Sequence, residues 1–244
     1  MKSQLKVHYF QHIGGEGSGS CIDFLKQHQA QITATEFFAL PVDRPLDIEA
    51  LPSVDEVDLL IIMGGTMSVN DEANYPWLKI EKRWLRRYLS QGKPAIGLCL
   101  GGQLIANALG AAVSRNQEQE LGWTTVRKVA HVPEDCFILP EQFEIMQWHS
   151  ETFELPKGAI HLAENEACRN QVYQLGKNVL GFQFHPEITP ETLKLFLENE
   201  EEISQFSGKY VQDIQQLKRT TKNNFIQGNQ ILNQAIQYVL EKTA

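Results

Sequence analysis

The stretch Pro94-Ala-Ile-Gly-Leu-Cys-Leu-Gly-Gly-Gln103 decides the fold of this chain. A short apolar run, typical of a buried strand, leads into Gly97-x-Cys99-x-Gly101, and a helical pattern follows at once. This is the nucleophile-elbow pattern, a sharp strand-to-helix turn, with cysteine in place of serine. The glycines relieve crowding at the turn, and the helix N-terminus beside the sulfur favours its reactive thiolate form. We therefore predict that Cys99 is a nucleophile and that the backbone N–H of Leu100 is an oxyanion donor. A structural cysteine in a glycine-rich turn is the alternative interpretation.

Strands and helices alternate around this turn in the first half of the chain. The apolar, β-rich runs lie at residues 5–13, 32–38, 57–63 and 94–98, and the helical patterns at 21–29, 77–89 and 102–109. This order predicts an α/β fold in which a mostly parallel, open sheet carries helices on both faces.

The second half is richer in strand patterns. Six further strands are expected at residues 124–132, 137–139, 144–148, 160–164, 171–175 and 179–184, before a helix at 190–199. From about residue 201 the pattern is helical. We therefore expect a main domain of residues 1–200 and a helical C-terminal extension, residues 201–244, packed on it.

Composition excludes several classes of protein. The chain has 244 residues, of which 42% are hydrophobic, enough for a sizeable core. Its net charge of −8 argues against a nucleic-acid-binding surface. The N-terminus is polar and does not resemble a signal peptide, and no apolar run approaches the ~18 residues of a membrane span. The four cysteines are scattered without a CxxC pair, which suits a reducing compartment. We therefore expect a cytoplasmic protein without nucleic-acid or membrane partners.

A cysteine nucleophile needs a base, and the base needs a group that orients it. The segment Leu180-Gly-Phe-Gln-Phe-His-Pro-Glu187 offers both. On an extended chain, residues i and i+2 share a face, with Cα atoms roughly 6–7 Å apart. Glu187 can therefore approach one imidazole nitrogen of His185 while the other nitrogen faces the thiol, and Pro186 stiffens the pair. In isolation this would be a surface pair at a strand end. Together with the cysteine turn it predicts a Cys99–His185–Glu187 triad.

A third buried strand ends in the paired glycines Gly64 and Gly65. Such a turn can direct a backbone N–H towards a neighbouring site and so supply a second oxyanion donor, although ordinary glycine turns are common. All three features follow predicted strands, and sites in open α/β sheets form beyond the carboxyl ends of the strands.

Other motifs argue against a cofactor. The loop Gly14–Gly19 follows a strand and precedes a helix, but Ser20 stands where a dinucleotide fingerprint needs glycine or alanine. The sequence has no GxxxxGK[ST] loop and no HExxH motif. We expect neither a metal nor a cofactor. The remaining cysteines are read as structural, and the acidic run Glu198–Glu202 as a solvated face.

Three motifs together identify a family resemblance. Gly-Leu-Cys99-Leu-Gly-Gly-Gln103, Met-Gly64-Gly65 and Gln-Phe-His185-Pro-Glu187 resemble the class I, or triad-type, glutamine amidotransferases. The resemblance is greatest to the glutaminase domain of GMP synthase and its free-standing relatives, and stretches 67–77, 121–123 and 147–153 are similar to the free-standing branch. It covers roughly residues 1–200 and implies a flavodoxin-like fold of three layers.

The resemblance also implies a reaction. Cys99 would attack the side-chain amide of glutamine, His185 would activate the thiol and protonate the departing ammonia, and Glu187 would orient His185. Water would then release glutamate from a glutamyl thioester, and a synthase partner would accept the ammonia. The remaining residues would form the oxyanion hole and the substrate pocket, namely Gly64, Gly65, Leu100, Gln103, Trp148, His149 and Ser150.

Two positions depart from the family pattern. Gly102 stands where many relatives have histidine, and Ser150-Glu151 stands where the family usually has Gly-Asp beside the glutamine pocket. The second departure, with no synthase domain in the sequence, favours as an alternative a free-standing hydrolase of another γ-glutamyl compound. A catalytically silent binding or regulatory module is the remaining alternative.

Overall fold

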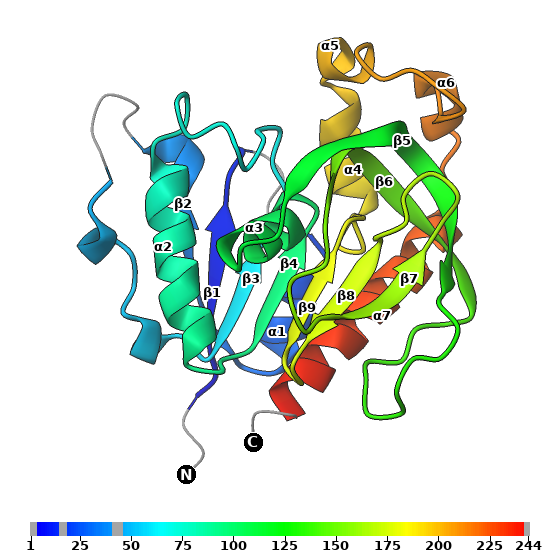
Figure 1. Cartoon of the computed structure of the whole chain (residues 1–244). Coiled ribbons are helices and arrows are strands. Elements are labelled where there is room, and N and C mark those ends of the chain that lie inside the picture. The colour runs from blue at the N-terminus through cyan, green and yellow to red at the C-terminus, as the bar shows by residue number, and fades with distance from the viewer. Residues whose placement is uncertain (1–3, 15–18, 41–45, 242–244) are drawn as a thin grey trace.

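The computed structural model describes residues 4–14, 19–40 and 46–241. Within these residues ten strands form one sheet: β1 (Lys6–Gln11), β2 (Gln31–Glu36), β3 (Leu59–Ile62), β4 (Ala95–Leu98), β5 (Val113–Lys128), β6 (Gln142–Phe153), β7 (Ile160–Glu164), β8 (Val172–Leu175), β9 (Val179–Phe182) and β10 (Tyr210–Val211). The strand order is β10-β5-β7-β8-β9-β4-β3-β1-β2, and β6 pairs with β5 outside this path (Figure 1).

The described part of the chain also contains seven α-helices. They are α1 (Cys21–Gln27), α2 (Trp77–Ser90), α3 (Leu100–Ala108), α4 (Pro190–Leu197), α5 (Glu200–Ile203), α6 (Ile214–Leu217) and α7 (Lys222–Glu241). Short 3-10 turns span Phe37–Ala39, Ile48–Ala50 and Val54–Glu56. Within the described residues, no helix is both long and apolar enough to cross a membrane.

The expected α/β sheet is confirmed, and it is mixed. From β2 through β1, β3 and β4 to β9, every neighbouring pair is parallel. From β9 through β8 and β7 to β5 and β6, every pair is antiparallel. The change agrees with the connections, because α1 lies between β1 and β2 and α2 between β3 and β4, whereas β7, β8 and β9 follow one another without an intervening helix.

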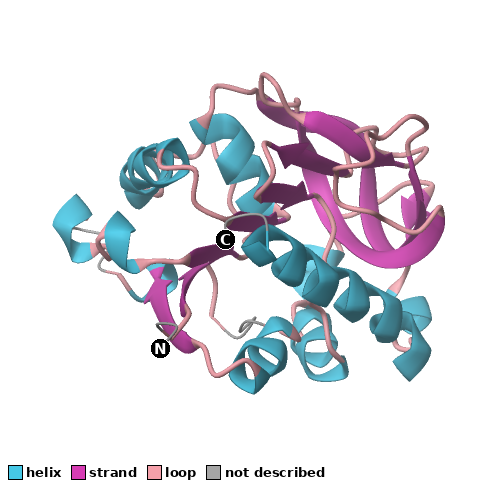
Figure 2. Cartoon of the chain, turned by 90° about the horizontal axis from the view of Figure 1, so that it is seen from below, coloured by secondary structure: helices cyan, strands magenta, loops and turns pink. Residues whose placement is uncertain are grey.

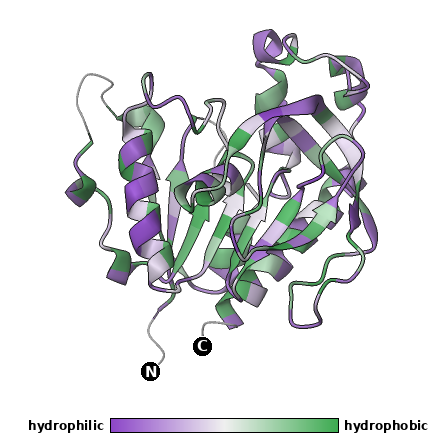
Figure 3. Ribbon diagram, in the orientation of Figure 1, coloured by the Kyte–Doolittle hydropathy of each residue, from purple (hydrophilic) through white to green (hydrophobic). Residues whose placement is uncertain are grey.

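Alternating side chains divide the core between the two faces of the sheet. In β3, Leu59 and Ile61 pack with α1 and α7, whereas Leu60 and Ile62 pack with α2 and α3. Figure 2 shows these helices on opposite sides of the strands, and Figure 3 shows the central strands as mostly hydrophobic. The expected helical layers on both faces are therefore present.

One expected strand is absent from the described structure. Residues 137–139 form no strand, and the N–H of Phe137 donates instead to the side-chain oxygen of Gln174 at 2.8 Å. Phe137 and Leu139 are buried whereas Ile138 is 74% exposed. The three apolar residues resemble a short buried strand in the sequence, but in the structure Phe137 and Leu139 anchor a loop against the core.

The C-terminal segment includes the long helix α7, which lies against β6. Its buried residues Ile231, Leu232 and Ile236 belong to the same apolar cluster as the central strands. The short strand β10, which the sequence did not predict, pairs with β5. The division into residues 1–200 and 201–244 stays a prediction.

Candidate active site

Cys99 stands between β4 and α3, where the backbone turns sharply. Its backbone angles are φ 50° and ψ −109°, in a region that side chains rarely adopt. The turn leaves no room for side chains at the two flanking glycines. A Cβ at Gly101 would lie 2.1 Å from the carbonyl oxygen of Ile62, and one at Gly97 would lie 2.4 Å from that of Gly101. The glycines predicted from the elbow pattern therefore permit close packing against β3 and within the turn.

The thiol of Cys99 faces an enclosed set of polar groups. It donates to the carbonyl oxygen of Trp148 at 3.6 Å, and the amide nitrogen of Gln183 donates to its sulfur at 3.8 Å. Cys99 is 5% exposed and lines a cavity of about 400 Å³, which His185 also lines. The side chains of Cys99 and His185 therefore face the same cavity.

His185 follows β9, and its backbone N–H donates to the carbonyl oxygen of Met146 at 2.9 Å. Its Nδ1 donates to Oε1 of Glu187 at 2.8 Å, and both side chains are buried. Burial lowers the pKa of His185, but the charges of Glu187 and Cys99 outweigh this effect and raise the pKa well above its usual value. The remaining ring nitrogen is therefore the one available to the thiol.

Segments distant in sequence hold Glu187 in place. The N–H of Ser20 donates to the carbonyl oxygen of Glu187 at 2.9 Å. Gly19 has φ +53°, and a Cβ there would lie 2.3 Å from the same oxygen. The sequence marked this loop only as a poor nucleotide motif, and its residues 15–18 lie outside the described residues. From α7, the amide of Asn229 donates to the carbonyl oxygens of Pro186 and Ile188 at 2.8 and 3.0 Å.

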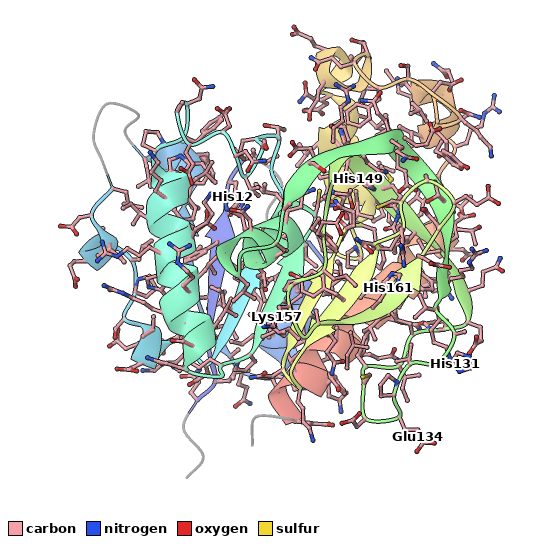
Figure 4. All side chains as sticks on the ribbon, in the orientation of Figure 1. His12, His131, Glu134, His149, Lys157 and His161 are labelled. Carbon is pink, nitrogen blue, oxygen red and sulfur yellow. The ribbon has the colours of Figure 1, made fainter. Side chains whose placement is uncertain are left out.

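The glycine pair is anchored by a histidine that the sequence did not single out. His12 donates from Nδ1 to the carbonyl oxygen of Gly64 at 3.0 Å, and its Nε2 lies 2.9 Å from Oε1 of Glu81. Both side chains of this pair are fully buried. Figure 4 shows His12 at the upper end of β1. Gly65 lines the cavity.

The expected substrate-binding residues divide into two groups. Gln103, Trp148, His149 and Ser150 line the cavity together with Gly65, whereas Gly64, Leu100 and Glu187 are not among the described residues that line it. Gln103 donates from its amide to the backbone oxygen of Glu151 and to the side-chain oxygen of Gln183, both at 3.2 Å. This side chain therefore joins the wall of the cavity to the strand β6.

His149 takes part in a buried hydrogen-bond network. Its Nδ1 donates to the backbone oxygen of Glu151 at 3.0 Å, and its Nε2 lies 3.0 Å from Oε2 of Glu120. Figure 4 places His149 beneath β5. Glu120, His149 and Cys168 are close enough to hold a metal ion. However, Asn165 and Thr124 donate to one oxygen of Glu120, and Gln171 donates to the other. These bonds account for the burial of Glu120 without an ion.

A second wall of the cavity comes from α4, α5 and the turn after them. Leu195, Phe196, Asn199, Glu202 and Phe206 lie there. The expected solvated face of residues 198–202 is thus only partly exposed, because Glu202 is half-buried. Burial raises the pKa of the Glu202 carboxyl. No periodic pattern in the sequence indicated that this segment would line the cavity.

Comparisons with known proteins agree with this arrangement. The family model for glutamine amidotransferase class-I matches residues 24–202. A glutamine amidotransferase-like protein of Salmonella typhimurium, YfeJ, is 31% identical over 214 residues, which cover 84% of this chain and 85% of that protein. A glutamine-hydrolysing GMP synthase subunit from Sulfolobus acidocaldarius is 32% identical over 57% of this chain and 72% of its own length.

A solved structure extends the likeness to nearly the whole chain. The crystal structure of a glutamine amidotransferase from Methylobacillus flagellatus superposes with a TM-score of 0.87 at 28% identity, covering 98% of this chain and 95% of that chain. The fold, the matched family model and the relatives agree. This chain belongs to the class I glutamine amidotransferases.

Proposed function

We propose that this protein is a glutaminase in which Cys99, His185 and Glu187 act together. The observation that carries the proposal is that Cys99 and His185 line one cavity while Oε1 of Glu187 lies 2.8 Å from Nδ1 of His185. With Nδ1 donating to Glu187, the remaining nitrogen of His185 is positioned to take the thiol proton.

The chemistry proceeds in two halves. The sulfur of Cys99 forms a bond to the side-chain carbonyl carbon of glutamine, and the C–N bond breaks as His185 returns its proton to the nitrogen, which leaves as ammonia. Water then attacks the glutamyl thioester, giving its proton to His185, and the thiol departs with that proton as glutamate is released.

Two backbone groups would stabilise the oxyanion. The N–H of Leu100 lies at the N-terminus of α3, next to the nucleophile, and Gly65 lines the cavity. Gln103, Trp148, His149 and Ser150 would bind the substrate. A synthase partner would accept the ammonia, which is supported by the relative that is named as a separate GMP synthase subunit.

The test is glutamate release from glutamine by the purified protein, with Cys99→Ala as the matched variant. We expect the variant to lose at least about a thousand-fold in rate, because the residual rate lacks the nucleophile. Covalent labelling by a glutamine-analogue electrophile, read by mass spectrometry, should modify the wild-type chain at Cys99. Failure of both glutamine turnover and labelling would refute the proposal and favour a silent binding module.

A further inference from the structure

Two chemically different groups of residues line the cavity that Cys99 and His185 also line, and we call these groups its two ends. One end is polar. Ser68 donates to a carboxylate oxygen of Glu151 at 3.1 Å, and Gln103 donates to the backbone oxygen of Glu151 at 3.2 Å. Arg115 stands opposite Glu151 in the β5–β6 ladder. All four residues line the cavity, and they bring both signs of charge to this end.

The other end is largely aromatic, although Asn199 and Glu202 of the same wall also line the cavity. The ring of Phe196 lies 5.0 Å from that of Trp148 and 5.9 Å from the imidazole of His185, measured between centroids. Phe206 lies 6.4 Å from Trp148. Leu195, which is 44% exposed, also lines the cavity. These four apolar residues come from β6, α4 and the turn after α5.

The chemistry of the reaction assigns a role to each end. The α-amino and α-carboxylate groups of a glutamyl substrate carry charges, so the polar end with Arg115 and Glu151 suits them. The departing nitrogen must lie beside His185, which protonates it. A substituent on that nitrogen would lie near His185 and therefore near the ring of Phe196, whose centroid is 5.9 Å from that of the imidazole. Ammonia has no such substituent and leaves this aromatic end unused.

We propose that Trp148, Leu195, Phe196 and Phe206 form a leaving-group subsite, and that the protein also hydrolyses γ-glutamyl amides of apolar primary amines. This inference rests on the proposed function, because it uses the same thioester chemistry. A γ-glutamyl amide and water yield glutamate and the free amine, with His185 supplying the proton to the amine nitrogen. Binding of the apolar substituent excludes water from aromatic surface and so lowers the barrier for these substrates.

Three substrates test the subsite, namely glutamine, γ-glutamylmethylamide and γ-glutamylbenzylamide. We expect kcat/KM for the benzylamide to exceed that for the methylamide by about tenfold or more, which is the usual effect of filling an apolar pocket. Phe206→Ala should reduce this ratio about tenfold, whereas Phe206→Leu should retain most of it. Ile138→Ala removes a comparably apolar side chain that is 74% exposed and lies outside the cavity lining, and it should leave the ratio unchanged.

Binding gives a readout that does not depend on turnover. In the Cys99→Ala background, calorimetry should show about tenfold tighter binding of the benzylamide than of the methylamide, and addition of Phe206→Ala should abolish the difference. If the protein hydrolyses glutamine and γ-glutamylmethylamide, but kcat/KM for γ-glutamylbenzylamide is about equal to that for the methylamide, the subsite is overturned and the glutaminase proposal stands. Failure to cleave any of the three, together with no labelling of Cys99, would overturn both.

Discussion

The buried pair of His12 and Glu81 gives a quantitative prediction about stability. The carbonyl oxygen of Gly64 can only accept, so Nδ1 of His12 must carry a proton. At Nε2, either the ring donates to a carboxylate or a protonated Glu81 donates to the ring. A glutamine at position 81 can donate from its amide to Nε2 and so keep both hydrogen bonds. Alanine at either position cannot.

The expected losses follow from what each variant leaves unpaired. Glu81→Gln should cost about 1 kcal/mol or less, because hydrogen bonding persists. Glu81→Ala leaves a buried ring nitrogen without that partner and should cost about 1–3 kcal/mol, with a further amount for the cavity. His12→Ala removes the partner of a fully buried Glu81 and leaves a cavity in place of the imidazole, and if the pair is charged it should cost about 3–5 kcal/mol. For a domain of this size the last value corresponds to a fall in Tm of about 6–20 °C.

Urea and thermal unfolding would measure these differences, with tryptophan fluorescence as the signal. Trp77 stacks on His12, with ring centroids 5.6 Å apart, so its emission reports on the pair as well as on global unfolding. The predicted order of stability is wild type, then Glu81→Gln, Glu81→Ala and His12→Ala. If Glu81→Gln and His12→Ala lower the free energy of unfolding equally, the reasoning is refuted, because retention of the hydrogen bonds would then not determine the loss of stability.

Two further predictions concern the N-terminal segment. Gly19→Ala should reduce glutamine hydrolysis by at least about tenfold without altering Cys99 itself. The added Cβ would clash with the carbonyl oxygen of Glu187, and φ +53° disfavours alanine. Wild-type kinetics in this variant would show that the contact does not position Glu187. Burial lowers the pKa of His8 to about 4, so its contribution to stability is present above the unfolded value near 6.5 and is lost as pH falls towards 4. Between pH 6.5 and 4 the free energy of unfolding of the wild type, measured with urea, should fall by about 3 kcal/mol more than that of His8→Gln. If the two proteins lose stability in parallel as the pH falls, a group other than His8 is responsible.

Local patterns in the sequence predicted much of the parallel half of the fold. The strand-turn-helix pattern around Cys99 and the paired glycines are short-range signals, and the structure places Cys99, Gly65, Gln103 and His185 on one cavity. Their catalytic roles stay predictions. Strand β5 was expected only from residue 124. Residues 114–119 are all polar and at least partly exposed, and the pairing of β5 with β6 shifts register between Arg115 and Glu120. Such a segment lacks the apolar alternation that marks a strand.

The supporting residues were missed for a different reason. His12 and Glu81 are separated by 69 positions, and Asn229 is 43 positions from Pro186. No spacing rule joins such residues, because tertiary packing alone brings them together. Glu202 was read as solvated because acidic runs usually are, yet its place on α5 brings it to the wall of the cavity.

The backbone at Cys99 sets the proposed catalytic role of this residue against the conformational stability of the chain. A side chain held at φ 50° and ψ −109° costs on the order of 1–3 kcal/mol, which glycine would not incur. A lineage that no longer needed the thiol would therefore gain stability by replacing it with glycine, a change that a single base substitution provides. A chain that keeps cysteine at this position therefore forgoes the stability that glycine would add. Across descendants of this fold, residue 99 would thus record whether selection still acts on chemistry or only on the scaffold.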